Sequence, residues 1–569
     1  MNDQKRIMIA IALSLAILFG FQLLVAHFWP SAITPQQQSI KDSLGNASDY
    51  KAESINPSFG QAVNSFDNRA VALATTKRIK INTPTIKGSI SLIGARIDDI
   101  VLDDYHVTLD PASGPIHLLE PTNYVRPYYA EFGWVSKTIN DIDLPNSKTK
   151  WESSAAELTP NSSVTLTWKS QHCLTFKRTI EVDDNYMFNI TDSVSNEGNI
   201  TRELFPYALI SRSSLPKNTG FYILHEGPLG VFDDTLMEID YNDLHEQDDK
   251  EVHSKSGWIG FTDKYWLVAL ISDQSTELNY KFRHSIINHN ERFQVDYMGT
   301  AKRLRIGDKI TNKLHLFAGA KRLDLLDKYE EQIGVPKFDL AIDFGWFYFL
   351  TKPFFILLTW FHSILGNFGL AILALTVCIK LLFFPLANKS YRSMAKLKEL
   401  APRIQEMRKK HGANLQLINK DIMEMYKLEK VNPAAGCLPI IVQIPVFFSL
   451  YKVLFVNIEM RHAPFFGWIH DLSAPDPTTI FNIFGLLPWS PPSILMIGVW
   501  PLLMGVTMFL QQQMNPRPND PVQAKIFMFL PLIFTFLLSN FAAGLVIYWT
   551  WNNLLSIIQQ RVIMRRISV

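Results

Sequence analysis

Cysteine is scarce in this sequence, and the few copies are far apart. The chain has three cysteines among 569 residues, each in a different region: Cys173, Cys378 and Cys437. Without two cysteines at close spacing, the sequence predicts neither a disulfide framework nor a Cys-x-x-Cys metal site.

Common catalytic and nucleotide-binding motifs are also missing. The chain has no G-x-x-x-x-G-K-[ST] loop for phosphates and no G-x-S-x-G turn for a serine nucleophile. His225-Glu226 and His245-Glu246 each lack the second histidine of an H-E-x-x-H zinc motif, so we interpret both as surface pairs. We therefore expect no enzyme, no cofactor, no metal site and no energy source carried by the chain itself.

Charged residues are few, and they are unevenly placed. They make up 19% of the chain against 47% hydrophobic residues, a more apolar balance than an ordinary soluble protein has. The apolar residues concentrate at residues 7–29 and again after residue 343, with a polar block between them. The formal net charge of +2 says little about partners, because the placement of charge around the apolar runs carries the information. This pattern predicts a membrane protein of several domains.

The N-terminal apolar run predicts a retained membrane anchor. It extends from Ile7 to Phe28 after two basic residues, and a cleavable signal has an apolar region of only about 7–15 residues. We interpret residues 1–29 as a transmembrane helix with its N-terminus in the cytoplasm. Residues 30–70 are polar and lack periodicity, which predicts a flexible linker.

The polar block, residues 71–335, predicts a β domain. Short runs alternate apolar and polar residues, as in Val164-Thr-Leu-Thr-Trp168, and Asp-Asp, Pro and Gly turns separate them. This period of two indicates an antiparallel sandwich. The segment from Trp258 to Ile271 is apolar on both faces but too short to cross a membrane, so we expect one central buried strand. Lys321 to Ile333 predicts a short charged helix.

One basic residue interrupts an apolar run in the C-terminal third. Lys380 lies within Ala371 to Leu386, a run apolar enough to enter a bilayer. A lysine at the centre of a membrane costs about 2.5 to 3.5 kcal/mol, so such residues usually face a bundle interior or a water-filled cavity. The alternative is that Lys380 snorkels to the nearer surface, about 10 Å away. The first interpretation predicts a polar pocket inside the membrane.

The rest of the C-terminal third predicts a polytopic helical domain. Residues 336–366 suit an amphipathic helix lying in the interface, or equally the first half of one spanning helix, before a break at Gly366-Asn367. Residues 367–569 predict a core of five helices, the Lys380 helix and four further apolar runs, at 437–457, 493–512, 526–541 and 544–562. With the N-terminal anchor, this predicts an all-α bundle of six transmembrane helices.

Basic residues predict the orientation. The segment between Ala387 and Asn432 carries eleven lysines and arginines against five acidic residues, which predicts that it lies in the cytoplasm. Both termini then also lie in the cytoplasm, and the β domain lies outside. The charge of this segment is either a solvated face that sets orientation or a surface for a ribosome or anionic lipids.

Within residues 388–432, the spacing of apolar residues predicts two amphipathic helices that pair across a turn at His411-Gly412. The apolar rows are Leu397, Leu400, Ile404 and Met407, then Leu415, Ile418, Ile422 and Met425. The sequence therefore predicts a cytoplasmic helical hairpin.

A set of short motifs runs through the membrane region. They are Phe383-Phe-Pro-Leu386, Ser393-Met-Ala-Lys396, Tyr426-Lys-Leu-Glu-Lys-Val-Asn-Pro433, Gly436-Cys-Leu-Pro439, Gln443-Ile-Pro-Val-Phe447, Trp468-Ile-His-Asp-Leu472, Met504-Gly-Val-Thr-Met-Phe509 and Gly544-Leu-Val-Ile-Tyr548. Together they resemble the YidC family of membrane protein insertases over the whole region from about residue 343. The layout of anchor, periplasmic antiparallel β-supersandwich and five further spans is similar to the Gram-negative members of that family.

The resemblance implies a hydrophilic groove, open to the cytoplasm and to lipid, that is lined by a basic residue five positions before the proline. That position is Lys380, where many members have arginine; lysine keeps the charge but loses the bidentate fork. By the same matching, Trp549 replaces a tyrosine. The substrate-groove residues implied are Lys380, Thr376, Gln443, Phe447, Tyr548 and Trp549. For the aromatic residues the alternative is ordinary helix packing, and Gln443 could simply cross-link helices.

The function implied is that of an insertase and chaperone of the bacterial inner membrane, which inserts and helps fold nascent membrane proteins. The partners implied are nascent membrane proteins, the Sec translocon, a ribosome at the basic loop and membrane lipids, with no specific nucleic-acid sequence. Two rival functions stay open. A small-solute or ion transporter could use Lys380 as its binding site, although the sequence shows no inverted repeat. A surface receptor or sugar-active enzyme could use the β domain.

Overall fold

The computed structural model divides the chain into two compact units, one ending at Asp343 and one from Phe344 to Val569. The described residues are 66–136, 143–213, 215, 224–246, 249–287, 290–411, 415–429, 438–484, 487, 489, 492, 496–515 and 521–567. The predicted anchor, residues 1–29, and most of the predicted linker lie outside the described residues.

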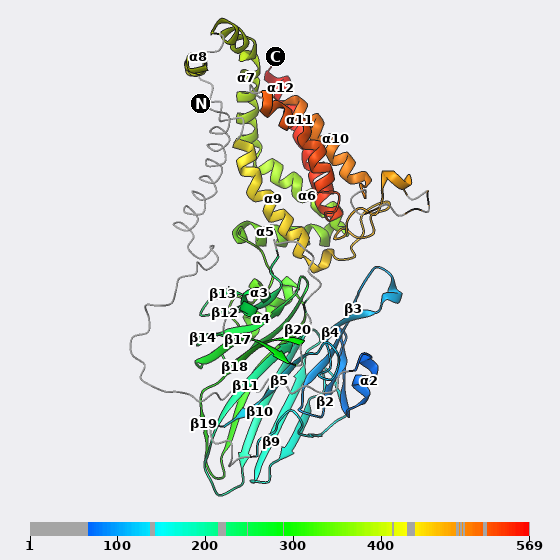
Figure 1. Cartoon of the computed structure of the whole chain (residues 1–569), viewed down its shortest axis with the longest axis vertical. Helices are drawn as coiled ribbons and strands as arrows, with labels where there is room; N and C mark the ends of the chain where they lie inside the picture. The colour runs from blue at the N-terminus through cyan, green and yellow to red at the C-terminus, as the bar shows by residue number, and fades with distance from the viewer. Residues whose placement is uncertain are drawn as a thin grey trace. The chain divides into compact units, whose positions relative to one another are not determined.

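The first unit contains two large β-sheets (Figure 1). Among the described residues, the eleven strands of one sheet are β1 (Arg78–Asn82), β2 (Ile86–Ser91), β3 (Ile97–His106), β4 (Pro115–Leu119), β5 (Tyr128–Val135), β7 (Glu157–Leu158), β11 (Arg202–Arg212), β14 (Lys250–Ser254), β17 (Leu278–Ile287), β18 (Asn290–Met298) and β19 (Lys302–Leu304). The nine strands of the other are β6 (Glu152–Ser153), β8 (Val164–Lys169), β9 (Leu174–Val182), β10 (Met187–Asn196), β12 (Gly227–Phe232), β13 (Thr235–Glu238), β15 (Gly257–Thr262), β16 (Trp266–Ile271) and β20 (Lys309–Ala320).

The predicted antiparallel β-sandwich is confirmed. The main path of the first sheet runs β14-β17-β18-β11-β5-β3-β2-β1-β7, and the second runs β13-β12-β15-β16-β20-β10-β9-β8-β6. Within the described strands, β1 with β7 is the one parallel pair. The single buried strand predicted from Trp258 to Ile271 is wrong, because that segment forms two antiparallel strands, β15 and β16. The polar residues 263–265 turn the chain between them, and Asp263 N donates to Trp266 O at 2.9 Å.

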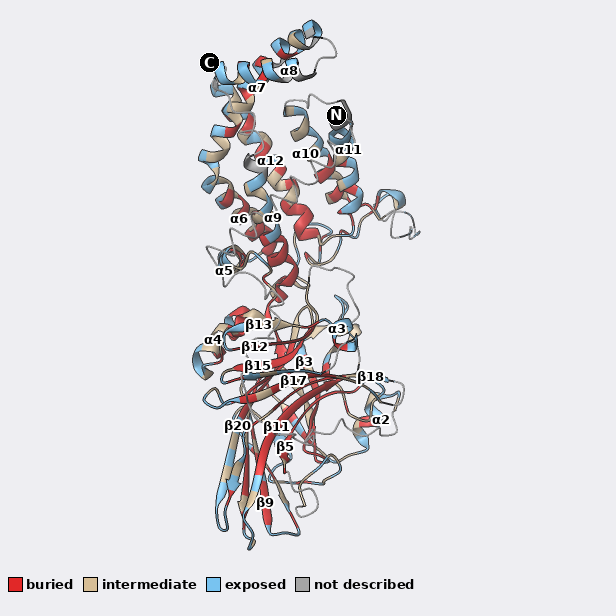
Figure 2. Ribbon diagram, turned by 60° about the vertical axis from the view of Figure 1, so that its left-hand side comes forward, coloured by how far each residue is buried: buried red, intermediate tan, exposed pale blue. Residues whose placement is uncertain are grey.

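The core between the sheets includes a buried ion pair. Arg178 of β9 is 1% exposed, and its guanidinium binds the Asp192 carboxylate at 2.6 and 2.9 Å. The same guanidinium donates to Ala95 O at 3.0 Å and to Phe132 O at 2.7 Å, which belong to the opposite sheet or its connection. These four hydrogen bonds pair the buried charge with a carboxylate and link the two sheets, so the charge is not left unpaired. Apolar residues surround it, and Figure 2 shows the buried positions along β5, β11 and β15.

Short helices complete the first unit. They are α2 (Arg69–Ala74), η2 (Pro111–Ser113), α3 (Tyr241–Glu246), α4 (Leu323–Ile333) and η3 (Phe338–Ala341). Helix α4 confirms the predicted charged helix and ends at Gly334, whose left-handed conformation closes the helix. Phe338 is fully buried against Trp258 and Phe317, so residues 338–343, expected in the interfacial helix, pack on the β unit instead.

The second unit is helical. Its α-helices within the described residues are α5 (Tyr348–Leu365), α6 (Phe368–Leu382), α7 (Phe384–His411), α8 (Leu415–Leu428), α9 (Leu438–Val456), α10 (Val499–Met514), α11 (Pro521–Leu537) and α12 (Ala543–Ile567), and short 3-10 turns η5 (Ile458–Met460) and η6 (Ile480–Asn482) follow α9. Helices α5 and α6 lie on either side of the expected break, where Gly366 is left-handed and Asn367 caps α6.

Helices α7 and α8 pack against each other through apolar rows. The buried residues at their contact are Leu400, Ile404, Ile418, Ile422 and Met425, with Leu397, Met407 and Tyr426 packed around them. An ion pair between Arg403 and Glu429, with 3.0 Å between Nη1 and Oε1, lies on the exposed side. These rows follow the spacings of three and four in the sequence, and the turn between the two helices lies outside the described residues.

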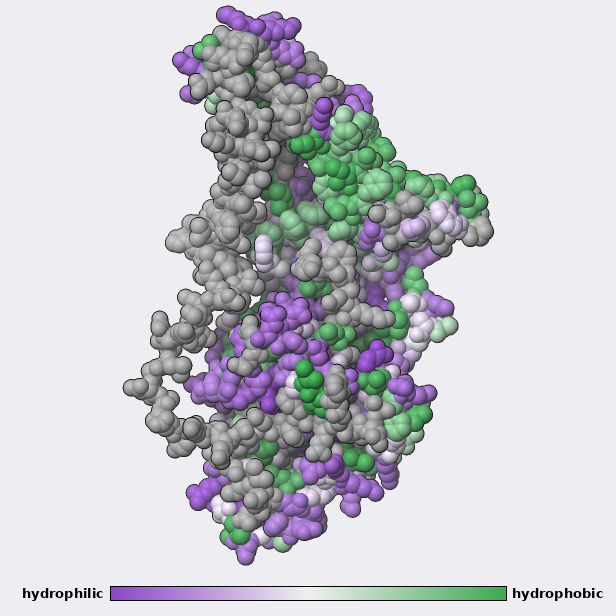
Figure 3. All heavy atoms as spheres, viewed as in Figure 1, coloured by the Kyte–Doolittle hydropathy of each residue, from purple (hydrophilic) through white to green (hydrophobic). Residues whose placement is uncertain are grey.

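The outer surface of the second unit is strongly apolar. Large side chains on α10 and α11 are half exposed, among them Val506 at 55% and Phe529 at 53%. Figure 3 shows hydrophobic residues over this region and hydrophilic ones at the α7 and α8 end. A patch of this kind is typical of a surface covered by lipid or protein.

The predicted count of six transmembrane helices is not confirmed. Within the described residues, α5 is long and apolar enough to cross a membrane, and α6 with the first part of α7 would qualify only as one span bent by 65°. Two further apolar helices, Ile441–Val456 and Lys525–Leu537, are shorter. The difference has a physical basis: α6 ends early, at Leu382, and α12 is long but contains the buried polar residues Thr550, Asn553, Ser556 and Gln560.

Candidate functional site

The candidate site is a pocket at the bend between α6 and α7. Helix α6 ends at Leu382, and α7 begins at Phe384 with Pro385 as its second residue. Proline lacks a backbone N–H and cannot continue the hydrogen-bond ladder of the preceding helix, but it fits the first turn of a new one. The chain therefore changes direction by 65° at this point, one turn after Lys380.

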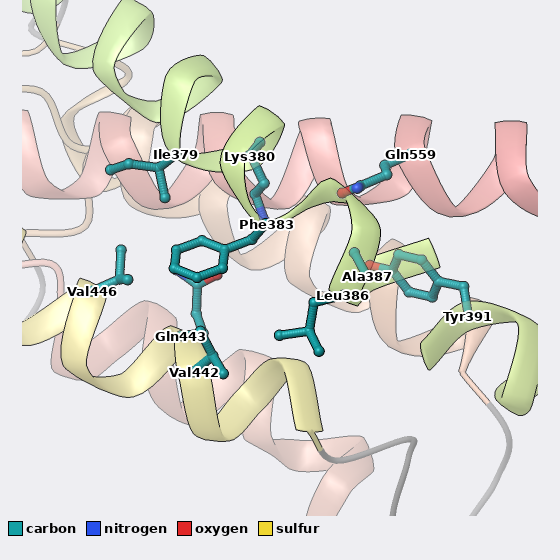
Figure 4. Close-up of a pocket in the computed structure, with 10 residues that line it drawn as sticks. All are labelled: Ile379, Lys380, Phe383, Leu386, Ala387, Tyr391, Val442, Gln443, Val446 and Gln559. Carbon is teal, nitrogen blue, oxygen red and sulfur yellow. The ribbon is translucent and has the colours of Figure 1, made fainter. Parts of the chain in front are cut away.

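Three parts of the second unit line this pocket (Figure 4). The lining residues are Ile379, Lys380, Phe383, Leu386, Ala387 and Tyr391 from the α6 and α7 segment, Val442, Gln443 and Val446 from α9, and Gln559 from α12. The pocket encloses about 450 Å³ of space between atoms, including open solvent at its mouth. Most of the wall is apolar, and the polar groups are one ammonium, two amides and one phenol.

Lys380 points into the bundle. Its Nζ donates to Ser556 Oγ of α12 at 2.8 Å, and Ser556 Oγ in turn donates to Asn552 O at 2.7 Å. In Figure 4 its side chain extends toward the space shared with Phe383 and Gln559. Within the described part of the chain, Lys380 forms no ion pair with an acidic residue. This geometry favours the interior interpretation over snorkelling, because the ammonium binds a neighbouring helix.

Gln443 lines the pocket and connects two helices. Its Nε2 donates to the hydroxyl of Tyr548 at 3.1 Å. Tyr548 itself is 2% exposed and is not among the lining residues. A buried phenol needs a hydrogen-bond partner, so Gln443 both shapes the pocket and satisfies Tyr548.

Thr376 is one helical turn before Lys380 but does not line the pocket. Its side chain is 2% exposed, and its hydroxyl donates to Ile372 O of the same helix at 2.7 Å. A threonine that bonds back to its own helix in this way has no free donor for a ligand. The structure therefore separates Thr376 from the other polar residues that the resemblance groups with it.

Phe447 and Trp549 belong to an aromatic cluster beside the pocket. Their ring centroids are 4.7 Å apart, and Trp549 also lies 5.5 Å from Phe534. Trp549 packs on a buried cluster that contains Met504 and Val546. Both rings are half-buried, so they contribute to packing between α9, α11 and α12 while leaving part of each ring accessible.

Sequence reasoning missed three residues at this site, Ser556, Gln559 and Tyr391. A signal for two of them exists on α12, where Asn552, Ser556 and Gln559 follow one another at spacings of four and three. Polar residues at this spacing lie on one helical face. Gln559 Nε2 is buried and has no hydrogen-bond partner among the described residues, so it is a donor available to a bound group.

The lining residues can bind polar or acidic groups. They include no histidine, cysteine, aspartate or glutamate, which are the residue types that bind zinc in proteins. A cation with amide donors instead suits the carboxylates, carbonyls and amides of a polypeptide.

Comparison with known proteins covers nearly the whole chain. Residues 78–357 match the family model described as YidC periplasmic domain, and residues 360–568 match the model described as 60Kd inner membrane protein. The membrane protein insertase YidC of Granulibacter bethesdensis is 48% identical over 574 residues, which cover 99% of this chain and 98% of the relative. That of Rickettsia massiliae is 47% identical over 561 residues, covering 98% of both chains. That of Bradyrhizobium diazoefficiens is 48% identical, covering 91% of this chain and 86% of the relative.

Proposed function

The chain belongs to the YidC family of membrane protein insertases, and on that premise we propose that the pocket around Lys380 receives hydrophilic segments of nascent membrane proteins. The protein is an insertase of the inner membrane with a β-sandwich periplasmic domain. Its substrates are nascent membrane proteins, and insertion makes and breaks no covalent bond, so the chain works without enzymatic chemistry.

The observation that carries the proposal is the inward-facing ammonium of Lys380 with a neutral partner. Ser556 accepts one hydrogen bond from it, and no acidic residue among those described neutralises the charge. An unpaired cation in a membrane region is costly, and its usual explanation is an aqueous cavity with a functional role. Such a cation attracts acidic segments of a substrate and reduces the cost of bringing them below the membrane surface.

The exposed face of α9 supports a route from this pocket into lipid. Gln443 lines the pocket, while Ile441, Ile444 and Phe448 of the same helix are between 44% and 48% exposed. An apolar substrate helix can pack on these side chains while its polar tail occupies the pocket. Partition of that helix into lipid then drives insertion, because burying apolar surface is favourable by about 25 cal/mol per Å².

The predicted topology is part of this proposal. It has six transmembrane helices, with both termini and the α7–α8 hairpin in the cytoplasm. This arrangement agrees with the rule that lysine and arginine are in excess in cytoplasmic segments. The apolar outer surface of α10 and α11 agrees with lipid contact. The hairpin exposes Lys396, Lys398, Lys409, Lys410 and Lys420. This basic surface suits a ribosome or anionic lipids, and the Sec translocon is a further proposed partner.

Crosslinking to a nascent chain tests the proposal. A photoreactive residue at Gln443 should crosslink to a stalled membrane protein with an acidic tail, whereas the same residue at Phe529 of α11 should not. Phe529 is 53% exposed among other apolar side chains of α11, and it does not line the pocket. Equal crosslinking from both positions would contradict a specific substrate pocket. Uptake of a solute by proteoliposomes, without insertion of the substrate, would instead support the transporter alternative.

A further inference from the structure

A cluster of potential metal ligands lies in the β unit, away from the Lys380 pocket. His245 is in the last turn of α3, and His284 and Glu291 are on the neighbouring strands β17 and β18. In the register of that pair, His284 faces Phe293 and Ile286 faces Glu291. His284 and Glu291 are therefore diagonal neighbours, and diagonal neighbours two residues apart project from the same face of a sheet.

The distances fit a metal ion. The ligand atoms of the three side chains all lie within 4.8 Å of one another, and His245 Nε2 is 3.3 Å from Glu291 Oε1. Zinc bonds of about 2.0 to 2.1 Å in a tetrahedron separate neighbouring ligand atoms by about 3.3 Å. The distance between His245 and Glu291 therefore already equals one edge of such a tetrahedron. Small side-chain rotations would bring His284, the third ligand, to the same distance.

A second observation points to a ligand at this position. His284 Nε2 is buried and has no hydrogen-bond partner among the described residues. The ring of His284 contacts those of His245 and Phe293, with ring centroids 4.8 and 4.9 Å away. A buried ring nitrogen without a partner is costly, and a metal ion would satisfy it.

We propose that His245, His284 and Glu291 bind one Zn²⁺ ion, with a fourth position open to water. Two imidazoles with one carboxylate suit zinc, whereas Mg²⁺ and Ca²⁺ prefer oxygen ligands alone. The sequence led us to expect no metal site because it has neither a Cys-x-x-Cys nor an H-E-x-x-H motif. Both motifs place ligands close together in the chain, and here the ligands come from a helix and two strands.

The ion would fix α3 on one face of the β17–β18 pair. His284 of β17 and Phe293 of β18 are directly opposed in the register, so their side chains lie on the same face. Helix α3 packs on both rings: the ring centroid of Tyr241 is 4.7 Å from that of Phe293, and that of His245 is 4.8 Å from that of His284. A zinc ion held by the helix and both strands would therefore stabilise the docked position of α3.

Titration of the untagged full-length protein in detergent tests the site. Zn²⁺ binding is measured by calorimetry, and Co²⁺ is used as a spectroscopic probe of tetrahedral coordination. The ligand variants are His245→Gln and His284→Gln. The control is His253→Gln. His253 is an exposed histidine whose Nε2 is 3.6 Å from Glu251 Oε1, and no third potential metal ligand from the described residues joins this pair.

The expected result is one Zn²⁺ per chain in the wild type and in His253→Gln. Each ligand variant should bind at least about 100-fold more weakly, since even partners of ligands cost 10–100-fold. Zn²⁺ should also raise the melting temperature of the wild type and the control but not of the ligand variants. Equal affinities in all four proteins, or an equal loss in the control, would overturn the proposal. Tighter binding of Mg²⁺ or Ca²⁺ than of Zn²⁺ would overturn it as well.

Discussion

Replacing Lys380 by methionine should impair the insertion of substrates with acidic tails and leave neutral-tailed substrates almost unchanged. Methionine is similar in length and apolar character to the lysine stem but removes the charge. The substitution leaves no orphaned partner, because Ser556 Oγ keeps its own hydrogen bond to Asn552 O. The pocket shape is therefore retained, and the measured effect reports the charge.

The magnitude follows from the position of the ammonium. Two unit charges 4 Å apart interact by about 4 kcal/mol at an effective dielectric constant of 20 and by about 1 kcal/mol in water. Lys380 is half-buried in a pocket with an open mouth, so an intermediate value of about 2 kcal/mol is appropriate. This corresponds to a loss of about 30-fold in substrate affinity. Lys380→Glu replaces attraction by repulsion and should roughly double the loss in free energy.

The assay uses cells depleted of the wild-type protein and supplied with each variant, with protease accessibility of a tagged substrate as the readout. Lys380→Arg should retain insertion. Lys389→Met is the matched control, since Lys389 of α7 is exposed and does not line the pocket. Equal insertion of acidic-tailed substrates by Lys380→Glu and the wild type would refute the role of the cation. An equal loss for neutral-tailed substrates would also refute it.

Three other predictions concern stability. Gln443→Leu removes the hydrogen-bond partner of the buried Tyr548 hydroxyl and should lower the free energy of unfolding by about 1–3 kcal/mol. The melting temperature in detergent should fall accordingly. Adding Tyr548→Phe should recover most of the loss. Ile404→Asp places a charge in the α7–α8 contact and should make the hairpin sensitive to limited proteolysis, whereas the same change at the 52% exposed Met423 should not. Burial raises the pKa of Asp296 from 3.8 to about 6. Between those values the folded protein holds a proton that the unfolded chain has lost. The free energy of unfolding should therefore fall as pH rises through this window, and Asp296→Asn should make that fall smaller in thermal denaturation.

The sandwich could be predicted from the sequence because alternation is a local property of each strand. Strand pairing is not local, and it explains the error over Trp258 to Ile271. The apolar run from Trp258 to Ile271 contains Asp263 and Lys264, whose turn separates β15 from β16. In a buried hairpin, both strands are apolar on both faces, so the continuous apolar pattern hid the turn.

The candidate site was only partly predictable. Lys380 could be identified because the cost of its charge depends on the apolar residues next to it in the chain. Its partner Ser556 is 176 residues away, and no local pattern connects the two. Thr376 shows the reverse case: it lies on the helix of Lys380 at a suitable spacing, yet its hydroxyl bonds to its own backbone.

The sequence by itself determined the chemical character of each segment: the β-rich block, the apolar helices, the basic hairpin and the cation Lys380 within an apolar run. These features depend on periodicity and on the cost of placing a residue among its chain neighbours, and both are local. Only the tertiary structure decided which polar groups meet. The packing of α6, α9 and α12 brings Lys380, Gln443 and Gln559 around one pocket, and the pairing of β17 with β18 beside α3 brings two histidines and a glutamate together. Such meetings depend on contacts between distant segments, which the local pattern of residues does not specify.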